Sequence, residues 1–167
     1  MSGQLKIPES RDLIYLANPH AIFSRYNGET DEMRLKDRVA IVSGGSRGIG
    51  AGIAKCMARE GAAVTVNYFK SKESAMKVVE EIKDAGGTAT AIKADVSDFT
   101  QVETMVNQTI SELGKVDIMV ANAGTKGHGK PLIELSQDEF SYTINNHLIG
   151  AFNCARSVLP HLRKQVR

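Results

Sequence analysis

Hydrophobic residues follow two alternating patterns along the chain: short uninterrupted runs, and longer stretches with helical spacing. The first clear run, Val39-Ala40-Ile41-Val42, is rich in β-branched residues and ends shortly before Gly44-Gly45. Such a run is typical of a strand buried on both faces. Apolar residues then recur at helical spacing from Ile49 to Met57 and stop at Gly61. This second pattern predicts an amphipathic helix.

The same alternation continues downstream. Its further elements are strands predicted over 62–66, 88–94 and 116–121 and helices predicted over 75–82, 102–113 and 137–164. Ser97 or Asp98 can cap the helix that ends before Gly114. Ser136 and Glu139 form a capping box at the start of the long helix. Strands alternating with helices predict an α/β fold with an open parallel sheet, whose ligands bind at the carboxyl ends of the strands.

Two regions of the chain suggest contacts or disorder outside this core. Residues 1–34 show no sustained period, and we expect them to form a loosely ordered N-terminal arm before a domain over 35–167. The helix over 137–164 carries apolar residues around much of its surface, which predicts packing on the sheet and on a partner such as a second copy. The strand over 116–121 is expected to leave an exposed sheet edge.

Composition narrows the class of protein. The 167 residues suit one domain, and 21 basic against 19 acidic residues give no global charge for nucleic acid or an anionic membrane. Cys56 and Cys154 are too few for a disulfide framework, and we expect them to be reduced core thiols. The run Leu13 to Ala17 is too short for a signal peptide, and no run approaches the length of a membrane helix. A cytoplasmic location is therefore expected.

The most informative stretch is the turn from Ser43 to Gly50, between the first predicted strand and helix. Its glycines have the spacing G-x-x-x-G-x-G. Gly44 permits a tight turn, Gly48 lets a pyrophosphate approach the backbone, and Gly50 lets the helix lie close to the strand. The helix N-terminus would then offer N–H groups and a positive dipole end to phosphates. A glycine-rich turn without a ligand is the alternative.

This turn resembles the cofactor motif T-G-x-x-x-G-x-G of the short-chain dehydrogenase/reductase family. Three later stretches resemble that family in the same order: Asp95-Val96, Ala121-Asn122-Ala123-Gly124, and His147-Leu148-Ile149-Gly150-Ala151-Phe152. The resemblance covers about 130 residues, from Leu35 to Arg167. It implies a Rossmann-like doubly wound parallel sheet with strand order 3-2-1-4, incomplete and followed by the family's long fifth helix.

The resemblance also implies a set of residues that contact the cofactor. These are Gly44, Ser46, Arg47, Gly48, Ile49, Gly50, Asn67, Tyr68, Lys70, Asp95, Val96, Asn122, Ala123 and Gly124. The sequence departs from the family motifs at three positions. Ser43 replaces Thr, Ala121 replaces Asn, and His147 stands where the catalytic-tetrad Asn normally lies. His147 could serve in that position or be a satisfied histidine in a helix interface.

The predicted cofactor is NADP(H), in preference to NAD(H). NAD-binding sites place a carboxylate after the second strand, whereas this chain continues Asn67-Tyr68-Phe69-Lys70 and has its next carboxylate at Glu73. Arg47 and Lys70 could pair with a 2′-phosphate, and Ser46 or Ser71 could donate to it. Arg47 and Lys70 could instead be ordinary solvated charges.

Other motifs are less convincing. The loop Gly124 to Lys130 nearly spells a P-loop, but Pro131 stands where Ser or Thr must bind magnesium. The histidines at 20, 128, 147 and 161 lack metal-ligand spacing.

The family's catalytic Ser and Tyr-x-x-x-Lys would follow the long helix. Tyr142 is the only tyrosine after the cofactor motifs, and Asn146, not Lys, lies four residues later. We therefore assign no catalytic residue. One hypothesis is that the chain is the NADP(H)-binding portion of an oxidoreductase that transfers hydride between nicotinamide and a carbonyl or alcohol substrate, with its sequence truncated. The other is a non-catalytic dinucleotide-binding or interaction protein. The substrate, the reaction direction and the oligomeric state are not predicted.

Overall fold

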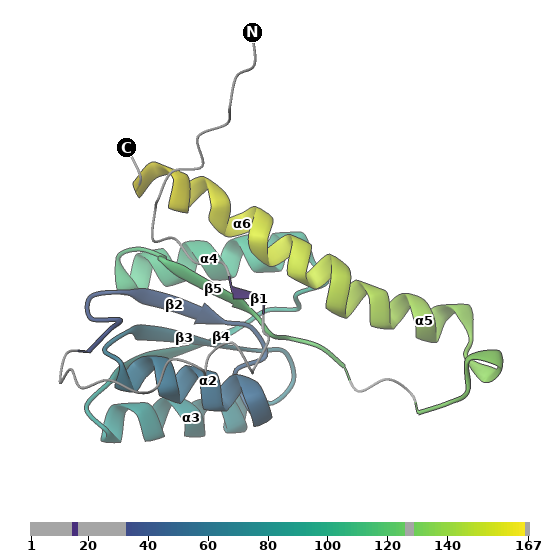
Figure 1. Ribbon diagram of the computed structural model, residues 1–167, viewed down its shortest axis with the longest axis horizontal. Helices are drawn as coiled ribbons and strands as arrows, with labels where there is room; N and C mark the ends of the chain where they lie inside the picture. The colour runs from purple at the N-terminus through teal and green to yellow at the C-terminus, as the bar shows by residue number, and fades with distance from the viewer. Residues whose placement is uncertain (1–14, 17–32, 126–128, 166–167) are drawn as a thin grey trace, which may run out of the picture.

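The computed structural model describes residues 15–16, 33–125 and 129–165. A parallel sheet lies between helices on both of its faces (Figure 1). Its strands, in spatial order, are β1 (Tyr15–Leu16), β5 (Ile118–Ala121), β2 (Val39–Val42), β3 (Ala63–Tyr68) and β4 (Thr88–Lys93). The four strands predicted from the sequence are, in chain order, β2, β3, β4 and β5. Across the sheet they lie in the order β4-β3-β2-β5, which confirms the predicted order 3-2-1-4.

The helices divide into two layers. Those along the sheet are α2 (Gly48–Arg59), α3 (Lys72–Asp84), α4 (Phe99–Leu113) and α6 (Gly150–Gln165). Helices α2 and α3 cover one face, and α4 and α6 cover the other (Figure 1). The alternation of β2 produces this division, because Ala40 and Val42 join the core under α2 and α3, whereas Ile41 joins the core under α4 and α6.

Local capping agrees with the expected element boundaries. Asp98 caps α4, since its carboxylate accepts hydrogen bonds from the backbone N–H groups of Thr100 and Gln101 at 2.9 and 3.2 Å. Ser136 and Glu139 form the predicted capping box at the start of α5. The starts of α4 and α5 are therefore defined by short-range hydrogen bonds that the sequence predicts.

The long helix differs from the expectation in its middle. It runs as α5 (Gln137–Ile144), a π-helical turn η2 (Asn145–Ile149), and α6, preceded by the 3-10 turn η1 (Leu132–Glu134). A π-turn inserts one extra residue into an α-helix and is frequent at functional sites. Here it lies just before Gly150, where an added Cβ would come within 2.7 Å of Val96 Cγ2. The register change therefore accompanies close packing of α6 against the loop after β4.

The predicted open edge at 116–121 requires a correction. Residues Tyr15 and Leu16 of the N-terminal arm pair in parallel with Val120 and Ala121 of β5. The rest of that arm before Met33 lies outside the described residues. The edge of β5 is therefore paired at its carboxyl end, because a short apolar segment upstream supplies the missing strand.

Candidate functional site

The glycine turn lies between β2 and α2, at the carboxyl edge of the sheet. Gly44 has φ +61° and Gly48 has φ +55°, in the left-handed region that side chains disfavour. A Cβ at Gly44 would also lie 2.9 Å from the Ala123 Cα. No side chain of the described residues caps α2 at Arg47. The turn therefore presents the start of α2 as an open, positively polarised helix end.

Gly50 determines how closely α2 approaches the turn. An added Cβ would overlap the Gly44 carbonyl oxygen and lie 2.5 Å from the Asn122 side-chain nitrogen. Gly52, two positions further and also helical, has open space around the corresponding Cβ. Close packing against the backbone therefore requires glycine at position 50, whereas position 52 has room for a side chain.

The Ser43 hydroxyl joins the turn to the loop after β5. It donates to the Val120 carbonyl at 3.1 Å and accepts from the backbone N–H groups of Asn122 and Ala123 at 2.9 and 3.0 Å. Its side chain also lies beside the thiol of Cys154 on α6, and burial raises the pKa of that thiol to about 11. Ser43 therefore supplies the hydroxyl that a Thr would offer, and Cys154 is a neutral core thiol.

Two asparagines hold the turn from its two sides. On one side, Asn122 Nδ2 donates to the carbonyls of Ser43 and Gly44 at 2.9 and 3.3 Å. On the other, Asn67 Oδ1 accepts from the Gly44 N–H at 3.1 Å, and its Nδ2 donates to carbonyls that include Ala94 at 3.1 Å. The side chain of Asn67 is buried and saturated by these bonds. Its role in the structure is to position the turn.

The loop after β4 forms the third part of this edge. Asp95 accepts from the backbone N–H and the hydroxyl of Ser97 at 2.9 and 2.7 Å, and Gln101 accepts from the Asp95 N–H. Val96 is buried, and its carbonyl accepts from Asn153 Nδ2 of α6 at 2.9 Å. The loop is therefore held both by its own turn and by α6.

Solvent-facing side chains surround this scaffold. Ile49 is 62% exposed at the first turn of α2, and Phe69 is 43% exposed beyond the end of β3. Arg47 and Lys70 are exposed on the same two segments. These segments therefore offer cations and apolar surface next to an open helix N-terminus. Such a combination suits a ligand with phosphate groups and flat rings.

His147 lies in the π-turn and contacts the loop after β5, not a helix interface. Its Nε2 is 3.0 Å from the Thr125 nitrogen and 3.1 Å from the Thr125 oxygen. A Cβ at Gly124 would overlap the imidazole ring. With Nε2 unprotonated the ring accepts from the Thr125 N–H, whereas the tautomer with a proton on Nε2 donates it to the Thr125 carbonyl. His147 thus positions the start of this loop.

The residues predicted from the sequence occupy four adjacent loops at one sheet edge. Hydrogen bonds of Asn67 and Asn122 join the β2–α2 turn to the ends of β3, β4 and β5. The structure therefore brings the predicted set together. By loop, it comprises Gly44, Ser46, Arg47, Gly48, Ile49 and Gly50; Asn67, Tyr68 and Lys70; Asp95 and Val96; and Asn122, Ala123 and Gly124. Whether each residue touches a ligand stays a prediction.

Sequence reasoning missed two features. Asn153 was not singled out, although a polar residue within the buried stripe of α6 is the signal that could have found it. Tyr68 and Lys72 also have the spacing Tyr-x-x-x-Lys. Tyr68 is only 9% exposed at the end of β3, and Lys72 begins α3. This pair does not supply the catalytic groups that the family would need after the long helix.

The described residues give no support to other kinds of site. Within residues 33–125 and 129–165 no group of His, Cys, Asp or Glu is arranged to hold a metal ion. Residues 126–128 of the loop that resembles a P-loop lie outside the described residues. Nor does the described part of the chain contain a helix with the length and hydropathy needed to cross a membrane.

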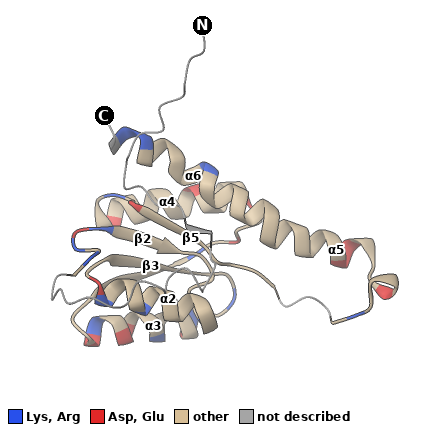
Figure 2. Cartoon of the chain, in the orientation of Figure 1, with Lys and Arg blue, Asp and Glu red and all other residues tan. Residues whose placement is uncertain are grey.

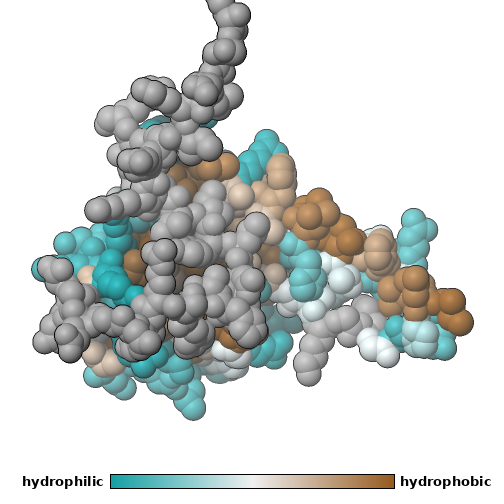
Figure 3. All heavy atoms as spheres, viewed as in Figure 1, coloured by the Kyte–Doolittle hydropathy of each residue, from teal (hydrophilic) through white to brown (hydrophobic). Residues whose placement is uncertain are grey.

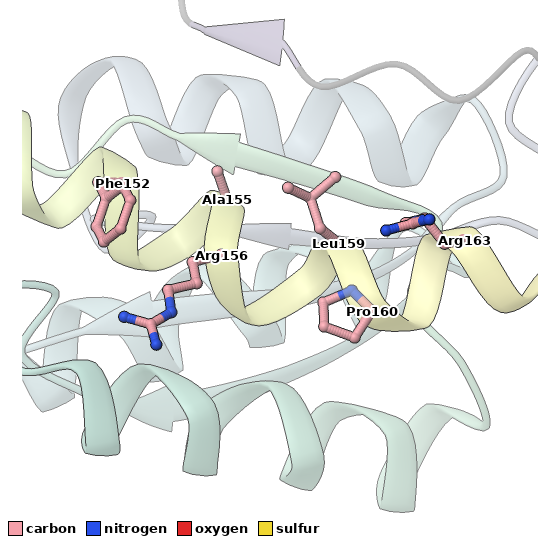
Figure 4. Close-up of a pocket in the computed structure, with 6 residues that line it drawn as sticks. All are labelled: Phe152, Ala155, Arg156, Leu159, Pro160 and Arg163. Carbon is pink, nitrogen blue, oxygen red and sulfur yellow. The ribbon is translucent and has the colours of Figure 1, made fainter.

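A separate apolar groove runs along the outer side of α6. Phe152, Ala155, Leu159 and Pro160 line it, with Arg156 and Arg163 beside them (Figure 4). Arg156 lies over the Phe99 ring at the start of α4, 4.6 Å from its centre. Hydrophobic residues gather along α5 and α6 in the space-filling view (Figure 3). The residues that line the groove all belong to α6, and none belongs to the glycine turn.

Comparison with protein families identifies the chain's relatives. The model described as short chain dehydrogenase matches residues 38–167. The chain is 41% identical over 136 residues to the short chain dehydrogenase claC of Passalora fulva, covering 81% of this chain and 51% of that protein. It is also 41% identical over 126 residues to the 3-oxoacyl-[acyl-carrier-protein] reductase FabG of Staphylococcus aureus, covering 75% and 51%. The chain thus spans about half the length of the curated relatives it matches.

Solved structures give the same result. A dehydrogenase/reductase from Sinorhizobium meliloti 1021 matches with a TM-score of 0.75 and 41% identity, over 78% of this chain and 52% of the other. A short chain dehydrogenase from Burkholderia cenocepacia J2315 in complex with NADP matches with a TM-score of 0.74 and 39% identity, over 77% and 52%.

Proposed function

Because the chain belongs to the short chain dehydrogenase family, we propose that it is the NADP(H)-binding portion of an oxidoreductase. The observation that carries the proposal is the turn from Ser43 to Gly50, held open at the start of α2 by Asn67 on one side and Asn122 on the other. The turn is already built in the structure, so binding a pyrophosphate requires no refolding of the backbone. One of the solved relatives is a complex with NADP.

The preference for NADP(H) over NAD(H) rests on charge at two segments. Arg47 caps α2 with its backbone and is exposed, and Lys70 is exposed just beyond β3. In dinucleotide-binding folds the region after this strand contacts the adenosine ribose. A 2′-phosphate would gain charge-assisted hydrogen bonds from these cations, and no carboxylate at 67–72 would repel it.

The proposed reaction is hydride transfer between the nicotinamide and a carbonyl or alcohol. The cofactor, when bound, supplies the hydride chemistry itself. The described residues supply binding and orientation: main-chain N–H groups of the turn for the pyrophosphate, and the loop at Gly124 and Thr125, held by His147, at the end of β5. We assign no proton donor among them. We therefore predict that these 167 residues alone reduce no carbonyl substrate, which a steady-state assay with NADPH would contradict by measurable turnover.

Calorimetric titration with NADPH and NADH tests the cofactor proposal. NADPH should bind more tightly than NADH. Arg47→Gln and Lys70→Gln should each weaken NADPH binding by about tenfold, since a hydrogen bond to a charged group contributes roughly 1.5–3 kcal/mol. Their effect on NADH should be small. Lys83→Gln, which removes the same charge at the opposite end of α3, is the control. Tighter NADH binding, or equal effects on both cofactors, would overturn the preference.

The alternative function is a non-catalytic dinucleotide-binding or interaction protein. The mass of the natural protein distinguishes the two proposals. A natural protein of about twice this length that contains the family's Ser and Tyr-x-x-x-Lys favours the oxidoreductase. Such a length agrees with the match to claC, which spans 51% of that relative. A natural protein of 167 residues that binds NADPH favours the non-catalytic dinucleotide-binding or interaction protein.

We further propose that the protein forms a homo-oligomer through the helical run from Gln137 to Gln165. Phe152 and Leu159 are 55% and 41% exposed along the groove of α6. The run begins with Asp138 and Glu139 and ends with Arg163 and Lys164 (Figure 2). A second copy in antiparallel orientation would bury the apolar stripe and bring the acidic start of one helix to the basic end of the other.

Two substitutions test this interface. Leu159→Asp should shift the protein to a monomer in sedimentation equilibrium, because a carboxylate would be buried without a partner. Met76→Asp, at a 41% exposed apolar position on α3, is the matched control and should leave the mass unchanged. A monomeric wild-type protein at high concentration would contradict the proposal.

A further inference from the structure

Two residues from far upstream occupy the outer edge of β5. Tyr15 pairs with Val120 and Leu16 with Ala121, both in parallel (Figure 1). They lie within the apolar run Leu13 to Ala17, which the proposed cofactor function does not use. This pairing extends the sheet by one strand on the side opposite β2.

Backbone alternation in β5 shows which groups the added strand covers. The Val120 carbonyl accepts from the Ser43 N–H at 3.0 Å, so Val120 directs its backbone groups toward β2. Its neighbour Ala121 then directs its N–H and carbonyl to the opposite side, where Leu16 is its partner. Without Leu16 these groups would form a free sheet edge that can template pairing with another chain.

The same edge is the position that fold topology assigns to a later strand. In doubly wound sheets the strand after the fourth lies parallel beside it, and crossovers between parallel strands are right-handed. Helix α6 packs on the face formed with α4 and follows β5 in the chain. A strand that followed α6 in a longer chain, such as the curated relatives, would therefore be directed to the edge that β1 occupies.

We propose that β1, Tyr15–Leu16, is a built-in edge strand, which shields the carboxyl end of β5 and excludes any other parallel strand from that position. One edge accepts one strand, so β1 must leave before a following strand or a second molecule can join there. The proposal rests on sheet topology alone and is independent of cofactor binding.

Hydrogen exchange of the full chain, without cofactor, tests whether β1 protects the edge of β5. The double variant Tyr15→Pro/Leu16→Pro cannot pair as a regular strand. Its Ala121 amide should exchange about tenfold faster or more, whereas the Val120 amide, which faces β2, should keep its protection. The matched variant Ala21→Pro/Ile22→Pro changes the same arm outside β1 and should leave both amides unchanged.

The retained protection of Val120 shows that the double variant is folded. If it is lost, Leu16→Pro alone provides the same comparison. Unchanged exchange at Ala121 in a folded variant would overturn the proposal, as would an equal acceleration in the Ala21→Pro/Ile22→Pro protein. A failure of NADPH binding would move neither amide and so is a separate result.

Discussion

The carboxyl edge of the sheet and the outer arm, defined as residues 132–149, are built in opposite ways. At the sheet edge, the side chains of Ser43, Asn67 and Asn122 each hydrogen-bond to the main chain of a neighbouring segment. In the outer arm no residue of α5 is buried, and Leu132 and Ile133 are 79% and 94% exposed. The first region is joined by buried or half-buried hydrogen bonds, whereas most hydrogen bonds of the second region are exposed to solvent.

The proposed cofactor site lies in the first region, and the proposed interface between copies includes part of the second. A turn that is fixed by buried hydrogen bonds can bind a dinucleotide without loss of backbone entropy, so its affinity should depend on packing behind the turn. The outer arm projects beyond the sheet (Figure 1) and presents apolar side chains to solvent. Its order should depend on local capping and on any surface that covers it. The following predictions test each half of this comparison.

The largest effect is expected at Gly50. Gly50→Ala should destabilise the protein by about 1–3 kcal/mol and abolish NADPH binding, because the methyl group overlaps the Gly44 carbonyl and displaces the turn. Gly52→Ala lies in the same helix with open space around it, and should stabilise by about 0.5–1 kcal/mol. Chemical denaturation and cofactor titration of both variants are the measurements. Equal behaviour of the two would show that the turn is not packed as described.

A smaller effect is expected at Ser43. Ser43→Ala leaves the Ala123 N–H without the hydroxyl that accepts from it and removes one of the two acceptors of the Asn122 N–H, which keeps the Val120 carbonyl. An unpaired donor beside a buried side chain should cost about 1–3 kcal/mol. Ser43→Thr keeps the hydroxyl and should restore most of that stability and the NADPH affinity. The difference in free energy of unfolding can be measured from the midpoints of chemical denaturation, provided that the dependence on denaturant concentration is the same for both proteins. A Ser43→Ala protein as stable as wild type would contradict the assigned hydrogen bonds.

The smallest effect concerns acid titration of the outer arm. The hydrogen bond from Lys130, with those from Ser136, lowers the pKa of Glu139 from 4.5 to about 2. Since the folded pKa is depressed, this contribution is present above pH 4.5 and is lost as pH falls toward about 2. Protection of the α5 amides, measured as exchange relative to the intrinsic rate at each pH, should decrease across that range, while protection at the β2–α2 turn should not. Glu139→Gln should exchange faster at neutral pH and lose the pH dependence; a variant that retains it would refute the assignment.

Much of the fold could be predicted because local signals and topology agree. The run Val39 to Val42 gave the bounds of β2 correctly, and the alternation of strands and helices gave the strand order. The π-turn at 145–149 could not be predicted, since no proline or glycine within it marks the change of register. The pairing of Tyr15 with Val120 was also missed, because it joins residues about a hundred positions apart that share no spacing.

The site was predicted as a set of residues but not as a set of roles. Glycine spacing located the turn, since only backbone geometry and close packing require those glycines. The role of Asn67 could not be read from its place after the second strand. Its amide binds the Gly44 N–H and three carbonyls. Two of these carbonyls, those of Ile92 and Ala94, come within reach only in the folded sheet. Side chains that position a turn and side chains that bind a ligand look alike in sequence.

The most direct test of the central claim is an NMR titration of the full chain that follows the backbone amides of Gly48, Ile49 and Gly50. These amides form the open end of α2. We predict saturable shifts at these positions with NADPH, at lower concentration than with NADH. Absence of shifts at α2 under saturating cofactor, or shifts confined to another surface, would contradict the assignment of this turn as the dinucleotide site.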